Sequence, residues 1–135
     1  MAQPVALLIS ADPDRRSTLR DMLQQSGYLA LVAGGAATAR LWLRRVTVDL
    51  VVSEADLPDA RVESILRALS STSRSCAVPT IVLGALTASE LRAAAGHAMV
   101  QVRPADTDLA SIAVLADAAR RGSPAARGRQ AHPVM

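Results

Sequence analysis

Residues 49–58 read Asp49-Leu50-Val51-Val52-Ser53-Glu54-Ala55-Asp56-Leu57-Pro58, an apolar run that passes into carboxylates and ends at a proline. Such a continuous apolar run is typical of a strand buried on both faces of a parallel sheet. In an open α/β sheet, ligands and chemistry gather just beyond the carboxyl ends of the strands. A functional site is therefore expected around Glu54 and Asp56.

Other apolar runs have the same character, and helical patterns separate them along the chain. The runs lie at residues 5–9, 28–32, 80–83 and 99–102, and the central strand itself spans residues 50–53. Strands that alternate with helices in this way predict an α/β fold in which helices cover both faces of a parallel sheet. The predicted architecture is a doubly wound five-stranded parallel sheet.

Several helix ends are marked by capping residues. Asp12 followed by Pro13 predicts the start of the first helix, and Gly27 predicts its left-handed end. The sequence Thr87-Ala88-Ser89-Glu90 has the capping-box pattern that opens a helix. The apolar spacing assigns Trp42 to the core. The inward faces of the second, third and fifth helices are predicted to be Ala39, Trp42, Leu43 and Val46; Val62, Ile65, Leu66 and Leu69; and Leu109, Ile112, Ala113 and Ala116.

All fifteen basic residues are arginine, and the formal net charge is +3. The absence of lysine excludes chemistry that needs a lysine Schiff base. Residues 1–120 carry twelve arginines and twelve acidic residues, so the excess comes from Arg121, Arg127 and Arg129. Residues 1–120 are formally neutral and have no aromatic residues interleaved with the basic ones, which argues against nucleic-acid binding by this part of the chain. Contact with nucleic acid stays an alternative only for the tail that follows.

The sequence predicts one domain over residues 1–121 and a disordered tail rich in Arg, Pro, Gly and Ala over residues 122–135. Cys76 is the only cysteine, so no internal disulfide or multi-cysteine zinc site can form. The first residues lack a basic signal-peptide region, and no apolar run approaches the roughly 18 residues of a membrane span. We therefore expect a cytoplasmic protein that contacts no membrane.

Four segments, each at the carboxyl end of a predicted strand, together resemble the receiver domain of bacterial two-component response regulators. They are residues 6–14, 49–58, 79–83 and 102–104, and the resemblance covers about residues 4–121. It implies a flavodoxin-like or CheY-like (βα)5 fold with strand order 2-1-3-4-5. It also implies phosphoryl transfer from a histidine kinase to an aspartate, assisted by Mg²⁺, an acidic pair, a hydroxyl group and a lysine.

The residues that carry this chemistry in the family are replaced in this chain. An alignment without gaps places Ser10 and Ala11 at the acidic pair and Glu54 at the phosphoacceptor. Gly84 takes the position of the switch hydroxyl, and Arg103 takes that of the lysine. Because the strands are preserved and the chemical positions are not, the chain resembles a degenerate receiver, or pseudo-receiver.

The remaining carboxylates make a poor metal site. Mg²⁺ prefers near-octahedral oxygen coordination and usually needs more than one well-placed carboxylate. Ala11 supplies none, whereas Asp12 is better explained as a helix cap and Asp56 as an exposed loop carboxylate. We therefore expect no cofactor and no functional Mg²⁺ site.

Glu54 has two interpretations. Its carboxylate lies one methylene farther from the backbone than that of an aspartate, so it could imitate a phosphorylated state by pairing with the Arg103 guanidinium. Alternatively, both side chains are partly exposed and loosely paired, and contribute less than ~1 kcal/mol. The sequence leaves both interpretations open.

The expected function is that of a signalling module rather than an enzyme. Gly84 and Val100 lack the hydroxyl and the aromatic ring of the family's switch, so the resemblance implies a domain fixed in one state. Such a domain would bind a protein partner, or a second copy of itself, through the fourth helix, fifth strand and fifth helix. The alternatives are a small ligand-binding domain or enzyme that uses Asp12, Glu54, Asp56 and Arg103, and an accessory to a DNA-bound transcription regulator.

Overall fold

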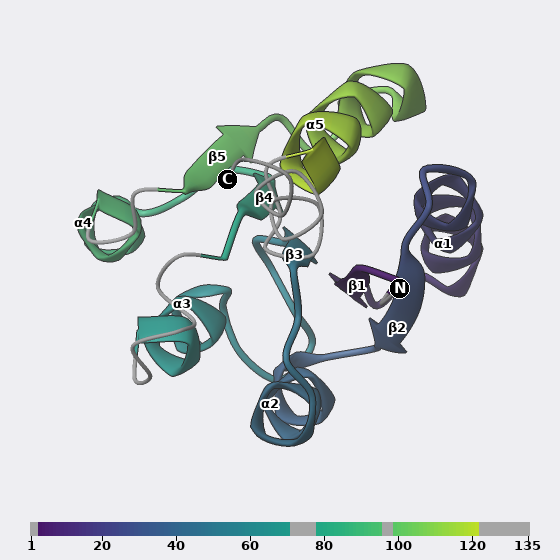
Figure 1. Cartoon of the computed structure of the whole chain (residues 1–135). Helices are drawn as coiled ribbons and strands as arrows, with labels where there is room; N and C mark the ends of the chain where they lie inside the picture. The colour runs from purple at the N-terminus through teal and green to yellow at the C-terminus, as the bar shows by residue number, and fades with distance from the viewer. Residues whose placement is uncertain (1–2, 71–77, 96–98, 122–135) are drawn as a thin grey trace, which may run out of the picture.

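A computed structural model describes residues 3–70, 78–95 and 99–121 of the chain. Five parallel strands form one sheet in the order β2-β1-β3-β4-β5, as Figure 1 shows. The strands are β1 (Val5–Ile9), β2 (Leu29–Ala33), β3 (Leu50–Glu54), β4 (Thr80–Leu83) and β5 (Val100–Arg103). The predicted fold class and strand order are confirmed.

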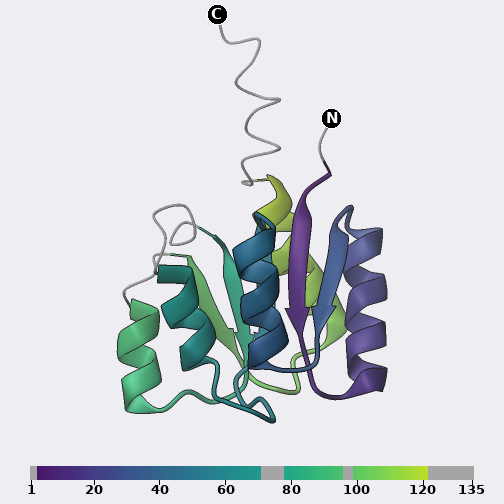
Figure 2. The ribbon, with the colours of Figure 1, turned by 90° about the horizontal axis from the view of Figure 1, so that it is seen from below.

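Helices cover both faces of the sheet (Figures 1 and 2). Helices α1 and α5 lie on one face and α2 and α3 on the other, and α4 lies beside α3 at the edge formed by β5. The helices are α1 (Pro13–Gln25), α2 (Ala36–Arg45), α3 (Glu63–Ser70), α4 (Ala88–Ala95) and α5 (Leu109–Arg121). Within the described residues, no helix is long and apolar enough to cross a membrane.

The central strands are buried on both faces, which explains why their sequences are continuously apolar. Successive residues of β3 alternate between two aliphatic cores, so that Val51 packs toward α2 and α3 and Val52 toward α1 and α5. Burial of apolar surface contributes roughly 25 cal/mol per Å². The two cores therefore hold the sheet rigid beneath the loops that follow its strands.

Three predicted strands differ from the structure by one residue: β2 and β5 each begin and end one residue later than predicted, and β3 ends at Glu54 rather than Ser53. Tyr28 instead follows the end of α1, where its backbone N–H donates to the Leu23 carbonyl. Its buried hydroxyl donates to the Ala116 carbonyl of α5 at 2.8 Å. Burial raises the pKa of that hydroxyl. Tyr28 is thus a core residue that joins α1 to α5 and not a strand residue.

The predicted inward faces of α2 and α3 extend beyond the helices themselves. Val46 is the C-cap of α2, and Val62 precedes α3 with its N–H bonded to the Ala55 carbonyl at 3.0 Å. Trp42 packs against the core and donates its indole N–H to Val32, as its assignment to the core predicts. The predictions for Cys76 and for the tail at residues 122–135 lie outside the described residues.

The strand register brings the polar strand ends to one edge of the sheet. Glu54 is opposite Leu83, and Leu83 is opposite Arg103. Figure 2 shows the loops that follow the strands gathered along that edge, where the helices also begin. A site built from these residues would therefore span the ends of the buried strands β3 and β4 and the more exposed edge strand β5.

Candidate functional site

The Glu54 carboxylate at the end of β3 has a partner for each of its oxygens. Oε1 accepts the Ala11 backbone N–H at 3.2 Å, and Oε2 lies 3.7 Å from the Nε of Arg15. The Arg15 guanidinium also donates to the Ala105 carbonyl, so it reaches from α1 across to the loop after β5. Both side chains are partly exposed, at 24% for Glu54 and 31% for Arg15.

The pair between Glu54 and Arg103, one of the two interpretations that the sequence left open, is not the arrangement in the structure, where Glu54 pairs with Arg15. Arg103 donates to its neighbour's carbonyl at Val102, at 3.0 Å, and to the Gln101 side chain at 2.9 Å. The ion pair that the structure records for Glu54 is the one with Arg15. Arg15 lies on the first turn of α1, directly beside the end of β3, so its guanidinium meets the carboxylate without crossing β4.

The two residues at the predicted acidic-pair positions differ in exposure. Ser10 is fully buried, its backbone N–H donates to Ala33, and its carbonyl accepts from the Arg16 guanidinium at 2.9 Å. Its Oγ has no hydrogen-bond partner among the residues that the structure describes. Ala11 is exposed and contributes only its backbone N–H, to Glu54.

Two further predicted site residues have local structural roles. The Asp12 side chain accepts the Asp14 N–H at 3.0 Å and so caps α1, as predicted. The Asp56 side chain is 85% exposed and lies 3.7 Å from Arg61, which confirms its assignment as an exposed loop carboxylate. Neither carboxylate bonds to Glu54 in the described part of the chain.

Gly84, directly after β4, has a conformation that a larger residue would not adopt easily. Its φ is +133°, and a Cβ added there would lie 2.9 Å from the Cβ of Ala55. The Gly84 N–H donates to Arg103 at 2.8 Å, which ties the loop to β5. The position therefore disfavours any residue with a Cβ, including the serine or threonine that would supply a hydroxyl.

The loop between β3 and α3 is anchored to α2 through Asp59. Its carboxylate accepts the N–H groups of Ala36, at 2.8 Å, and Ala37, at 3.0 Å, at the start of α2. These bonds lower the pKa of Asp59. Gly35 leaves room for the contact, since a Cβ there would lie 2.7 Å from the carboxylate.

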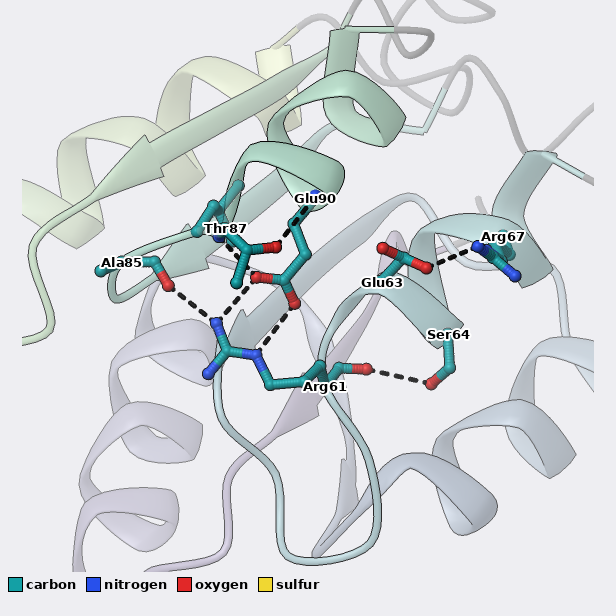
Figure 3. Close-up of a pocket in the computed structure, with 8 residues that line it drawn as sticks. Arg61, Glu63, Ser64, Arg67, Ala85, Thr87 and Glu90 are labelled. Carbon is teal, nitrogen blue, oxygen red and sulfur yellow. Dashed lines mark hydrogen bonds and ion pairs between the residues drawn. The ribbon is translucent and has the colours of Figure 1, made fainter.

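The same loop is anchored to α4 by an ion pair between Arg61 and Glu90, which Figure 3 shows in the wall of a cavity between α3 and α4. Arg61 donates through Nε at 3.0 Å and through Nη2 at 2.8 Å. Glu90 is 2% exposed, and the hydrogen bond from Arg61 lowers its pKa to about 2. The capping-box pattern indicated Glu90, but nothing in the sequence indicated its partner 29 residues earlier.

The cavity beside this pair has a volume of about 700 Å³. Its charged groups pair with one another: Glu63 accepts from Arg67 on the same helix and from the Ser89 hydroxyl of α4. A smaller cavity of about 270 Å³ lies between α1 and α5 and includes Arg15 in its wall. Neither cavity is lined by Glu54 or Arg103.

No protein-family model matches the sequence. An uncharacterized 14.6 kDa protein from Leptolyngbya boryana is 32% identical over 95 residues, which span 70% of this chain and 72% of that protein. The chain belongs to the same family as that protein.

Solved structures identify the fold. A sensor protein from Polaromonas sp. JS666 is 24% identical with a TM-score of 0.74, and the match covers 90% of this chain and 98% of that one. A response regulator receiver protein from Pseudomonas putida is 22% identical with a TM-score of 0.75, over 87% of this chain and 98% of that one. The chain has the receiver fold. The receiver domain of a Pseudomonas aeruginosa sensor histidine kinase, 18% identical with a TM-score of 0.73 and matching 88% and 98% of the two chains, holds a magnesium ion in its active-site cleft.

The residues of this receiver fold around Glu54 do not fit Mg²⁺. The Glu54 oxygens are engaged by the Arg15 guanidinium and the Ala11 N–H, and Ala11 offers no carboxylate. A divalent cation beside Glu54 would face the guanidinium charge, and would have one carboxylate where such ions usually require more. In the part of the chain that the structure describes, no group of three His, Cys, Asp or Glu side chains could hold a metal ion.

Proposed function

We propose that the chain is a phosphorylation-independent receiver-like module, a pseudo-receiver, that docks a protein partner in a cytoplasmic two-component-type pathway. The receiver fold supports the pathway, and the arrangement of Glu54 supports the independence from phosphorylation. The carboxylate at the phosphoacceptor position is already engaged by Arg15 and Ala11. This internal pairing is the observation on which the proposal rests.

The surrounding positions support the same proposal, because the groups that would respond to a phosphoryl group are missing or hydrogen-bonded elsewhere. Gly84 has no hydroxyl, and its conformation disfavours a residue that has one. Arg103 directs its hydrogen bonds to Val102 and Gln101. A module built in this way catalyses no reaction and holds one conformation.

The proposed docking face consists of α4, β5 and α5. The helices α4 and α5 flank the edge strand β5 (Figure 1), and each part of the face exposes an apolar side chain. Leu91 of α4 is 52% exposed, Met99 before β5 is 42% exposed and Val114 of α5 is 67% exposed. Exposed apolar side chains on adjacent elements are suited to the buried centre of a protein interface.

The substitution Leu91→Glu tests this face. We expect it to abolish capture of the partner from a cell extract of the native organism by the tagged full chain, because a charge at the centre of an apolar interface must be desolvated. Leu41→Glu is the matched control, since Leu41 on α2 is 45% exposed and lies on another face. It should leave capture unchanged, as should treatment with acetyl phosphate and Mg²⁺.

Two outcomes would contradict the proposed docking. Capture that survives Leu91→Glu would exclude this face as the docking surface. Capture that requires acetyl phosphate would exclude docking that is independent of phosphorylation. Size-exclusion chromatography of both variants distinguishes a second copy of the chain from a different partner, because only self-association changes the elution of the purified protein.

A further inference from the structure

Helix α4 buries little apolar surface, and one of its two buried residues is a carboxylate. It has eight residues, and only Glu90 and Ala94 are buried. Helices of this length are not stable alone in water, and in most proteins an apolar face holds them. Since Ala94 is small and Leu91 is exposed, the contacts of Glu90 must contribute much of what fixes this helix.

Those contacts join three parts of the chain at one carboxylate. Glu90 accepts from Arg61 with both oxygens, and its Oε1 also accepts the Thr87 N–H at 2.8 Å. The Glu90 N–H in turn donates to the Thr87 hydroxyl at 3.2 Å, which completes the capping box. Arg61 Nη2 also donates to the Ala85 carbonyl at 2.9 Å, so a single guanidinium holds both the loop after β4 and the start of α4 (Figure 3).

Arg61 is itself held by the rigid loop that follows Glu54. Its backbone pairs with that of Asp56, whose carboxylate lies 3.7 Å from the guanidinium. The adjacent Val62 N–H bonds to Ala55, and Asp59 fixes the loop to α2. The Arg61 side chain therefore extends from an anchored loop, which fixes its position beside α4.

We propose that the Arg61–Glu90 ion pair is a clamp that fixes the loop after β4 and the start of α4, in place of a phosphorylation-driven switch. Its effect on docking rests on the function proposed above, whereas its effect on α4 does not. Bidentate arginine–carboxylate pairs are directional as well as strong, and the carboxylate here is buried. The clamp keeps α4 in one orientation whatever happens at Glu54.

Amide hydrogen exchange of the full chain without any partner tests the clamp. We expect Glu90→Gln, which keeps an acceptor for Thr87 but removes the charge, to speed exchange of the α4 amides about tenfold relative to those of α1, because hydrogen bonds to a charged group are stronger than those to a neutral one. Arg61→Met should have the same effect. If Arg61→Met fails to fold, as judged by circular dichroism, Glu90→Gln alone decides the question.

The matched control is Arg67→Met. Arg67 also pairs with a glutamate, but on its own helix and at 73% exposure, so its removal should leave exchange in α4 unchanged. Unchanged exchange in Glu90→Gln, or an equal increase in Arg67→Met, would overturn the clamp. Since exchange is measured without a partner, failure of the clamp and failure of docking at Leu91 are separate results.

Discussion

Replacing Gly84 with threonine is expected to lower the free energy of unfolding by about 3 kcal/mol. Two effects add at this position. The backbone φ of +133° is strained for any residue with a Cβ, and that Cβ would lie 2.9 Å from the Ala55 Cβ. Restoring the hydroxyl of an active receiver should therefore cost stability before it could restore any response.

Urea unfolding followed by circular dichroism measures this loss. Gly34→Ala is the matched control, since a Cβ there would meet only the far end of the Arg16 side chain, at 3.3 Å, and we expect a change below about 1 kcal/mol. Combining Gly84→Thr with Ala55→Gly removes the contact but not the φ strain. The double variant should therefore lose about 1 kcal/mol less free energy of unfolding than the sum of the two single variants. A Gly84→Thr protein as stable as wild type would show that the loop adopts another conformation.

Acidification is expected to lower the free energy of unfolding through protonation of Glu90. The pKa of this carboxyl is about 2 in the folded chain, whereas its ordinary value, which applies to the unfolded chain, is 4.5. As the pH falls, the unfolded chain therefore takes up the proton before the folded chain does. The stability contributed by the ionised group is complete above pH 4.5 and falls as the pH drops toward 2. At pH 3 we expect the wild type to have lost about 1 to 2 kcal/mol more than Glu90→Gln, discounted because the Arg61 side chain is 41% exposed and screened by solvent.

Urea unfolding at pH 6 and pH 3 separates Glu90 from the groups around it. The charged and polar groups on the neighbouring elements are Arg61, Asp56 and Thr87, with Glu63 reaching α4 through Ser89. A Glu63→Gln variant should keep the pH dependence of the wild type, because Glu63 pairs with an exposed arginine of its own helix. The same loss of stability on acidification in Glu90→Gln as in wild type would contradict the assigned role of Glu90.

Much of the fold follows from simple patterns. The strands are recognisable because burial on both faces requires continuous apolar runs such as residues 50–53. The helix starts are recognisable because the Asp12 cap and the capping box at Thr87 involve residues only a few positions apart in the sequence. The strand order came from the resemblance, since apolar periodicity does not specify which strands are neighbours. Tyr28 was misplaced because its aromatic ring suits a strand and a helix–core junction equally.

The contacts of the site were less predictable. Arginine side chains are long and reach several acceptors, so the pairing of Glu54 with Arg15 rather than Arg103 depends on where the folded chain places the first turn of α1. The Arg61–Glu90 pair joins loops that are distant in sequence, and Arg61 lies outside any recognisable motif. Local patterns specify caps and strands, whereas ion pairs between loops depend on the assembled sheet.

Phosphorylation itself is the most direct test of an independent pseudo-receiver. The purified full chain would be incubated with acetyl phosphate and Mg²⁺, and separately with a phosphorylated histidine kinase, beside a receiver that has the aspartate and the acidic pair. Intact mass spectrometry then measures the covalent addition. We expect no mass increase in this chain and an increase of one phosphoryl group in the control receiver; a Mg²⁺-dependent increase in this chain that disappears in Glu54→Gln would contradict the proposal.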